Sequence, residues 1–253
     1  MSVYDRLGVK RVVNARGPAT VLGASRVSER IRRDVYEALD CSFEIYELQK
    51  RASEAIVNLT GAEAGCVTGC TAAGISVAVA ATLTGNDVAK IKSLPRIEGE
   101  KRKVVIQKGH ITGAGDAPIS QVIALTGAEV VEIGEALDCA TFHLEHALDG
   151  EVACAVYVLG DVFPPNLLPL VAFLRICKAK GVPVVIDAAY ETNFTHLIDK
   201  GADIVIHSAQ KWLGGPTAGI IAGRKDLIQA CFLQDLGIGR PMKAGKEGIA
   251  GAI

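Results

Sequence analysis

The chain has 253 residues, of which 49% are hydrophobic and 22% are charged, and its 27 Lys and Arg residues nearly balance its 28 Asp and Glu residues, for a formal net charge of −1. This composition excludes a disordered, collagen-like or coiled-coil chain. The lack of a basic excess argues against a surface built mainly to bind nucleic acid.

The longest apolar stretch, residues 72–83, is too short for a membrane span and contains Gly74, Ser76 and Thr82. We expect it to form a helix that is buried on nearly all sides inside a large α/β fold. The seven cysteines, an odd number without a C-x-x-C pair, indicate free thiols rather than a disulfide framework. The first residues carry charges and lack the apolar core of a secretory signal, so we expect a cytoplasmic protein without a membrane partner.

Helical and strand patterns alternate along most of the chain. Amphipathic helices are predicted over residues 28–39 and 45–59, the second ending at Gly61. Strands are predicted over residues 64–68, 103–107, 129–133, 153–159, 183–186 and 204–206, and further helices over 72–83, 141–148 and 167–179. Short β-branched runs separated by helices are typical of a parallel sheet that binds ligands at the carboxyl ends of its strands.

The end of the chain departs from this order. The strand pattern at 217–222 follows its predecessor after a Leu-Gly-Gly-Pro turn, which is too short for a helical crossover. We therefore predict an antiparallel strand and a mixed sheet. A helix at 226–233 and a glycine-rich loop at 237–248 follow, and residues 248–253 look like the opening turn of a helix that is never completed.

Two charged residues follow neighbouring predicted strands, Asp187 at the end of one and Lys211 just beyond the next. Neighbouring strand ends bring both groups into one crevice. A lysine amine that is partly desolvated beside a cofactor can form a Schiff base, and a carboxylate can keep a pyridine nitrogen protonated. Together the two residues predict a pyridoxal phosphate (PLP) site, in which the protonated ring accepts the electrons of a substrate carbanion.

Two further segments fit such a site. The turn from Gly69 to Gly74 offers backbone N–H groups and the Thr71 hydroxyl to a phosphate at a helix N-terminus. Cys70 in this turn is a thiol with a depressed pKa or a small side chain lining the loop. His110, in the glycine-punctuated loop 108–115, is expected at a strand end, where its ring would stack on the pyridine.

Each of these residues also has a purely structural interpretation. Asp187 could cap a helix, Lys211 could lie on the surface, and His110 could be hydrogen-bonded within its loop. His143 and His146 are spaced i and i+3 without a third ligand, so we expect a solvated helix face and no metal site.

The segments 187–191 (DAAYE), 207–211 (HSAQK), 69–74 (GCTAAG) and 12–17 (VVNARG) resemble the selenocysteine synthase (SelA)-like branch of fold-type I PLP-dependent enzymes. That branch includes L-seryl-tRNA(Sec) selenium transferase and D-glucosaminate-6-phosphate ammonia-lyase. The similarity extends from about residue 7 to residue 252. It implies a large α/β domain with a mostly parallel mixed sheet and helices on both faces.

The resemblance also implies residue roles. Lys211 would bind PLP covalently, Asp187 would face the pyridinium, and His110 would stack on the ring. We expect His207 to pack beside the lysine loop rather than to act in catalysis, and Gly214 and Gly215 to allow the close turn after the lysine. The other implied cofactor contacts are Gly69, Cys70, Thr71, Ala189 and Ser208.

Candidates for binding an anionic substrate group are Asn14, Arg16, Arg240 and Lys243, with surface solvation as the alternative for each. Fold-type I active sites are usually shared between subunits, so the resemblance implies a homodimer or larger homo-oligomer. We therefore expect the chain to consist of an N-terminal segment with helices (1–60), a PLP-binding large domain (61–236) and the start of an incomplete C-terminal region (237–253).

The implied activity is α,β-elimination from an amino acid with release of ammonia, with a phosphorylated sugar amino acid such as D-glucosaminate 6-phosphate as one substrate. The alternatives are a selenium transferase-like enzyme, a PLP-dependent aldolase or racemase, and an inactive truncated homologue. Selenium transferase has an additional N-terminal region for tRNA, and the family's large domain is normally followed by a smaller C-terminal domain. We expect both to be missing here, which argues against nucleic acid as a partner.

Overall fold

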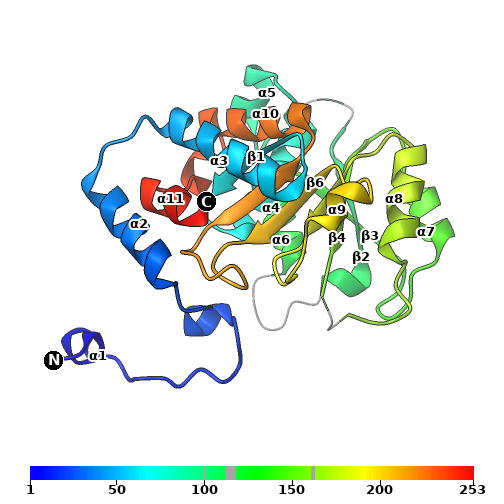
Figure 1. Cartoon of the computed structure of the whole chain (residues 1–253). Helices are drawn as coiled ribbons and strands as arrows, with labels where there is room; N and C mark the ends of the chain where they lie inside the picture. Colours follow the sequence, from blue (N-terminus) through cyan, green and yellow to red (C-terminus); the bar gives the residue numbers. More distant parts are fainter. Residues whose placement is uncertain (98, 100, 112–117, 161–162) are drawn as a thin grey trace.

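The computed structural model describes residues 1–97, 99, 101–111, 118–160 and 163–253 (Figure 1). The strands are β1 Ala64–Thr68, β2 Lys103–Gln107, β3 Glu129–Ile133, β4 Val152–Val158, β5 Val184–Asp187, β6 Ile204–Ser208 and β7 Gly219–Gly223. The helices are α1 Val3–Leu7, α2 Glu29–Asp40, α3 Ile45–Thr60, α4 Thr71–Thr84, α5 Val88–Ser93, α6 Ile119–Ala124, α7 Thr141–Ala147, α8 Leu170–Ala179, α9 His196–Asp199, α10 Lys225–Leu233 and α11 Lys246–Ala252.

The strands form one seven-stranded sheet in the order β1-β7-β6-β5-β4-β2-β3. Strand β7 is antiparallel to both of its neighbours, and the other neighbouring pairs are parallel. The mixed, mostly parallel sheet is therefore confirmed. Because β7 alone runs in the opposite direction, the carboxyl ends of the other strands lie at one edge of the sheet, where ligands bind in such folds.

Helices cover both faces of the sheet (Figure 1). Helix α4 packs on one face, where Ile75 and Val79 share an apolar cluster with Ile206 and Ile221 of the central strands. Residues 74–81 of α4 are all buried, as the apolar sequence predicts. On the other face, helices α7, α8 and α9 contribute Leu144, Phe173 and Leu197 to a second cluster.

The end of the chain differs from the expected single helical turn. Residues Lys246–Ala252 form the seven-residue helix α11, and its Ile249 is fully buried with Ala52 and Ile56 of α3. In Figure 1 this helix lies between α2 and α3. The described part of the region 237–253 thus packs against the N-terminal helices, and the proposed domain boundaries remain a prediction.

The first residues of the chain form an arm that leaves the body of the molecule (Figure 1). Between Met1 and Gly17 every residue is exposed, including those of α1. The arm returns to the body where the amide of Ser25 donates a hydrogen bond of 3.0 Å to the carbonyl of Gln210. Residue 26 is therefore held beside the turn that carries Lys211.

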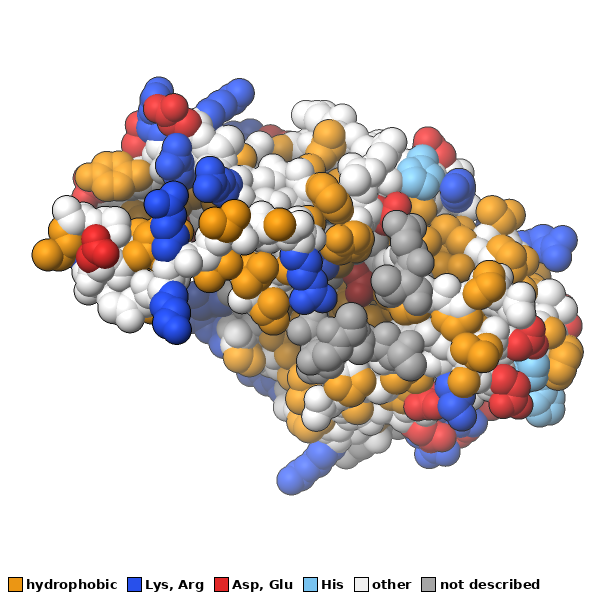
Figure 2. Space-filling view, turned by 90° about the horizontal axis from the view of Figure 1, so that it is seen from below, with side chains coloured by type: hydrophobic (Ala, Val, Ile, Leu, Met, Phe, Trp, Pro, Cys, Tyr) orange, Lys and Arg blue, Asp and Glu red, His pale blue; other side chains and the backbone are white. Residues whose placement is uncertain are grey.

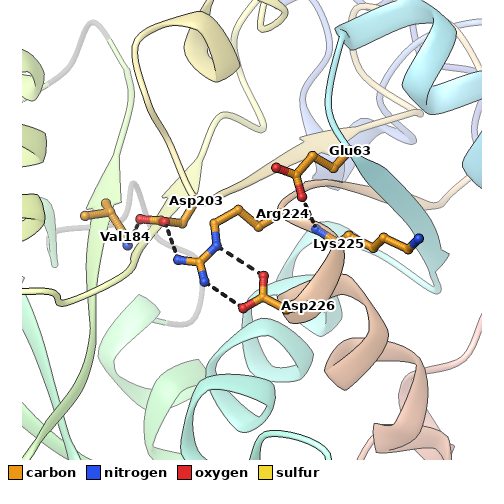
Figure 3. Close-up of polar contacts among 6 residues, drawn as sticks. All are labelled: Glu63, Val184, Asp203, Arg224, Lys225 and Asp226. Atoms are coloured by element: carbon orange, nitrogen blue, oxygen red, sulfur yellow. Dashed lines mark hydrogen bonds and ion pairs between the residues drawn. The ribbon is translucent and has the colours of Figure 1, made fainter.

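The amino ends of the parallel strands, at the opposite edge of the sheet, are joined by charged side chains (Figure 3). Arg224, which follows β7, pairs with Asp203 at 2.9 Å and with Asp226 at 2.6 Å. Asp203 also accepts a hydrogen bond from the amide of Val184 at the start of β5. These contacts fix the amino ends of β5 and β6 and leave the carboxyl ends for the ligand.

All seven cysteines are free thiols, as expected. Within the described ranges, no helix combines the length and the apolar character needed to cross a membrane.

Candidate functional site

Asp187 is the last residue of β5, and its carboxylate is half-buried at the carboxyl edge of the sheet. It accepts a hydrogen bond of 2.9 Å from the amide of Ala189. Burial raises the pKa of this carboxyl, and the Ala189 amide and the positive charge of Lys211 oppose the rise. Among the described residues Asp187 forms no ion pair, so its charge is available to a cationic ligand.

Lys211 lies in the turn after β6, and its ammonium is 5.2 Å from the centre of the Tyr190 ring. The structure thus brings Asp187 and Lys211 to neighbouring strand ends, as the sequence predicts. Figure 2, which views the molecule from below, shows an acidic side chain recessed beside a lysine or arginine near the middle of that face. In the part of the chain that the structure describes, the Lys211 amine has no carboxylate partner within ion-pair distance.

The turn between β1 and α4 presents an open helix N-terminus. Gly69 and Cys70 are half-buried, and the amide of Ala73 is capped only by the Cys70 sulfur at 3.4 Å. Thr71 is the first residue of α4, a helix of 14 residues. The free amide groups and the helix dipole at this position favour a phosphate.

His110 is buried at the carboxyl end of β2. Its Nδ1 atom accepts a hydrogen bond of 3.3 Å from the Val158 amide, and its ring meets Tyr157 and Phe163 edge to face at centroid distances of 4.6 and 4.9 Å. Burial lowers the pKa of His110 to about 4, so the ring is neutral at physiological pH. Stacking on the cofactor stays a prediction; residues 112–115 of the predicted loop lie outside the described residues.

The remaining predicted cofactor contacts lie close to these groups. Ser208 is buried at the end of β6, three residues before Lys211. Ala189 follows Asp187 and donates to its carboxylate. Their contacts with a cofactor remain predictions.

The predicted substrate-binding residues fall into two groups. In the first, Asn14 folds its own loop: its side chain donates to the carbonyls of Gly17 and Ala24 and accepts from the amide of Arg16. These hydrogen bonds give the Asn14 side chain a structural role that requires no substrate. Arg16 is exposed on the same arm.

The second group, Arg240 and Lys243, lies next to the predicted phosphate turn. The Gly69 amide donates a hydrogen bond of 2.8 Å to the Met242 carbonyl, and Lys243 forms an isolated β-bridge with Thr68. Burial raises the pKa of Asp235, and the charges of Arg240 and Lys243 oppose the rise. The backbone around Lys243 therefore lies at the predicted phosphate turn, and binding of a substrate by its side chain remains a proposal.

His143 acts within its own helix, because its Nδ1 atom accepts from the Ala140 amide at 3.1 Å. Within the described ranges, no three His, Cys, Asp or Glu side chains are grouped in a way that could hold a metal.

Sequence reasoning missed two aromatic residues of the site. Trp212 donates its indole N–H to the carbonyl of Tyr190 at 2.7 Å, and the two rings meet edge to face at 5.7 Å. Tyr190 belongs to the DAAYE segment, and the position after Lys211 is a tryptophan. Both aromatic residues therefore lie within or next to segments that the sequence singles out, but the predicted site residues were mainly charged or in glycine-rich turns.

The site fits PLP on three independent features. Asp187 is a half-buried carboxylate whose pKa burial raises and which has no cationic partner in the described residues, and this suits a pyridinium nitrogen. The N-terminus of α4 offers amide groups to a phosphate. Lys211 supplies a primary amine whose charge acts on the Asp187 carboxylate.

Comparisons with known proteins agree with this geometry. A family model described as L-seryl-tRNA selenium transferase (SelA) matches residues 184–251, the segment with Asp187 and Lys211. D-glucosaminate-6-phosphate ammonia lyase from Salmonella typhimurium (strain 14028s / SGSC 2262) is 36% identical over 100% of this chain and 68% of its own length. The 5'-C-glycyluridine monooxygenase-decarboxylase from a Streptomyces species is 37% identical over 99% of this chain and 63% of its own length.

A solved structure of D-glucosaminate-6-phosphate ammonia-lyase superimposes on this chain with a TM-score of 0.96 and 36% sequence identity. The match includes 100% of this chain and 68% of the solved one. The chain therefore spans about two thirds of the length of these two relatives.

Proposed function

Because the chain belongs to the SelA-like family of fold-type I PLP-dependent enzymes, we propose that it is an ammonia-lyase that acts on an amino acid by α,β-elimination. The observation that carries the proposal is the meeting of Asp187 and Lys211 at one edge of the sheet. A relative that is 36% identical over the whole chain is named for D-glucosaminate 6-phosphate. A phosphorylated sugar amino acid is therefore the first substrate class to test.

The residues of this chain have distinct tasks in that reaction. PLP, when bound, supplies an electron sink for the carbanion at the substrate α-carbon. Asp187 holds a proton on the ring nitrogen, and the N-terminus of α4 binds the phosphate. The Lys211 amine anchors the cofactor before the substrate arrives and then takes the α-proton.

The net reaction requires no oxidant or reductant. The α-proton leaves to the Lys211 amine, which passes that proton to the hydroxyl on the β-carbon, so that the hydroxyl leaves as water. The unsaturated amine that results takes up water and releases ammonia, which leaves a 2-oxo acid. Arg16, Arg240 and Lys243 are the proposed partners of an anionic group on the substrate.

The test is a panel of amino acids with a β-hydroxyl group, including D-glucosaminate 6-phosphate, assayed with the PLP-loaded protein. We expect ammonia and 2-oxo acid in equal amounts from the wild type and from a Lys200→Ala control, because Lys200 is an exposed residue at the end of α9. The variant Lys211→Ala should release neither product. A loaded wild type that releases no ammonia from the whole panel would contradict the proposal.

A decarboxylase is a second candidate, because the monooxygenase-decarboxylase relative is 37% identical over 99% of this chain. The same pair of charged residues could labilise the bond to the carboxylate instead of the bond to the α-proton. The panel distinguishes the two activities: uptake of O2 with release of CO2 would favour the decarboxylase, and ammonia without CO2 would favour the lyase.

A further inference from the structure

Two ring N–H groups from the segment that carries Lys211 hold two consecutive carbonyls of the turn that carries Asp187. The Nε2 atom of His207 lies 2.7 Å from the carbonyl oxygen of Glu191. The indole nitrogen of Trp212 donates to the carbonyl of Tyr190, also at 2.7 Å. His207 precedes Lys211 by four residues and Trp212 follows it directly, so the two bonds flank the lysine.

The histidine is fixed in one protonation state. A carbonyl oxygen only accepts hydrogen bonds, so Nε2 of His207 carries the proton and donates it to Glu191. Burial lowers the pKa of His207 and the charge of Lys211 lowers it further, whereas the backbone contacts with Glu191 and Ser208 oppose the fall. The ring is fully buried and stacks on Phe194 at a centroid distance of 4.0 Å, with 27° between the planes. It is therefore a rigid donor with no hydrogen-bond partner for Nδ1 in the described part of the chain.

Trp212 is more exposed than His207, and it also contacts the segment that follows Asp187. Its ring meets Tyr190 edge to face, and the Tyr190 ring in turn faces the Lys211 ammonium at 5.2 Å. The pairing of β5 with β6 ends at Asp187 and Ile206, and the Ala188 amide adds one more hydrogen bond to the Ile206 carbonyl at 2.8 Å. The Trp212 and His207 bonds link the two segments beyond that point.

We propose that His207 and Trp212 are positioning residues that join the Asp187 turn to the Lys211 turn and so fix the separation of the two charged groups. Neither side chain takes part in proton transfer. This inference rests on the proposed function in one respect, because its readouts use bound PLP.

The experiment compares His207→Phe, Trp212→Phe and the double variant with the full-length wild type. Phenylalanine keeps an aromatic ring at each position and removes the N–H donor. It also removes Nδ1 of His207 and one of the two fused rings of Trp212, which packs on Tyr190. The measurements are the dissociation constant for PLP, the visible circular dichroism per bound PLP and the melting temperature of the protein without cofactor. The control is Thr126→Val, which removes a buried hydroxyl bonded to the Ile123 carbonyl before β3, at the opposite edge of the sheet.

We expect each single variant to raise the dissociation constant about threefold to tenfold, the range for one lost hydrogen bond. The double variant should exceed the product of the two single effects, because either bond alone still holds the turn. The visible circular dichroism per bound PLP should fall in all three variants. His207→Gln, which keeps an N–H donor, should recover part of the affinity. Thr126→Val should lower the melting temperature without changing either PLP readout.

The inference is overturned if the variants lose thermal stability as Thr126→Val does but keep the wild-type PLP affinity and circular dichroism. Trp212→Phe alone suffices for this decision if His207→Phe does not fold, because Trp212 is 46% exposed. A wild type that binds no PLP would overturn the proposed function together with the inference, whereas a loaded wild type with unaffected variants overturns the inference alone.

Discussion

At the scale of single residues, the site depends on one carboxylate that folding leaves without a cationic partner in the described residues. Asp187 is held by a backbone amide and by the charge of Lys211 at a distance, and burial still raises its pKa. A cation bound beside it would offset that cost. The sequence predicted both residues, because charged side chains at neighbouring strand ends have few structural tasks.

The first residue-scale prediction concerns this charge. Asp187→Asn keeps the shape and removes the charge, so the ring nitrogen loses its partner. The loss of one buried charged contact costs about 2–5 kcal/mol, which lowers kcat roughly 30-fold to several thousand-fold. Steady-state ammonia release measures the effect, with Asp199→Asn, an exposed residue of α9, as the control. An unchanged kcat in Asp187→Asn would contradict the assigned role.

The second residue-scale prediction concerns His110 and pH. Burial lowers its pKa from 6.5 to about 4 in the folded chain. Above pH 6.5 the ring is neutral in both states; between pH 6.5 and 4 only the unfolded chain takes up the proton. The folded state therefore loses up to about 3 kcal/mol as the pH falls through this range.

His110→Phe should flatten this loss in urea unfolding of the cofactor-free protein at pH 7.5 and 4.5. His207, with a lowered pKa, and Asp187, with a raised pKa, give slopes of opposite sign. His207 and Asp187 are present in the wild type and in the variant. The difference between the pH slopes of the two proteins therefore isolates the contribution of His110. His146→Phe, at an exposed position of α7, should keep the wild-type slope. Equal slopes for His110→Phe and the wild type would refute the prediction.

At the scale of elements, helix α4 lies close enough to the sheet that its first turn depends on a glycine in β7. A Cβ atom at Gly219 would lie 2.6 Å from the carbonyl carbon of Cys70 and 2.7 Å from the Thr68 hydroxyl. Cys70 belongs to the predicted phosphate turn, and Thr68 is the last residue of β1 before that turn. The antiparallel strand therefore supports the cofactor site without contributing a side chain to it.

Gly219→Ala should destabilise the protein by about 1–3 kcal/mol, because the backbone must shift to make room. It should also weaken PLP binding, because the shift displaces the start of α4. Gly150→Ala is the matched control: its Cβ would meet no atom within 4 Å, so its effect should stay within about 0.5 kcal/mol. Thermal unfolding and PLP titration of both variants test this, and equal behaviour of the two would contradict it.

The sequence predicted the long elements well, for physical reasons. The ranges 64–68, 103–107 and 129–133 coincide with β1, β2 and β3. The buried strand β2 has a continuous apolar centre, and the edge strand β3 was recognisable by its β-branched residues. Helix α8 starts at Leu170 rather than at 167, because proline at 169 disfavours helical backbone before it. The short helices α5, α6 and α9 were missed, since four to six residues carry no readable period.

At the scale of the whole molecule, the arm and α2 leave large apolar side chains exposed. Val13 is 89% exposed and Tyr36 is 76% exposed, and both belong to the first 40 residues. Large apolar patches on a protein surface mark sites of contact with other chains, and further exposed apolar side chains of the same region are Leu7, Val12 and Leu39. This exposure supports the proposed homo-oligomer, which the sequence suggested only through family resemblance.

The corresponding prediction is a dimer or larger species in sedimentation velocity at micromolar concentration. Val13→Glu should shift the distribution toward the monomer, because a charge on the arm opposes burial of this surface. Val171→Glu, on the 64% exposed position of α8, should leave the distribution unchanged. A monomeric wild type would contradict the oligomer.

The chemistry of the site was easier to predict than its substrate. The strand order places Asp187, Lys211 and the turn at Gly69 together, and each has a recognisable sequence signal. The candidate substrate-binding residues lie on the arm and in the segment after residue 236, whose positions depend on contacts distant in sequence. The loop role of Asn14 and the bond between Gly69 and Met242 could not be predicted from spacing alone.

The most direct test of the central claim is reduction of the PLP-loaded protein with borohydride, followed by peptide mass mapping. For the wild type we predict one reduced pyridoxyl phosphate group per chain, attached to Lys211. Lys211→Ala should lack both the visible absorbance of bound PLP and the pyridoxyl label, and Lys200→Ala should keep both. A label on another lysine, or a visible band that persists in Lys211→Ala, would contradict the account.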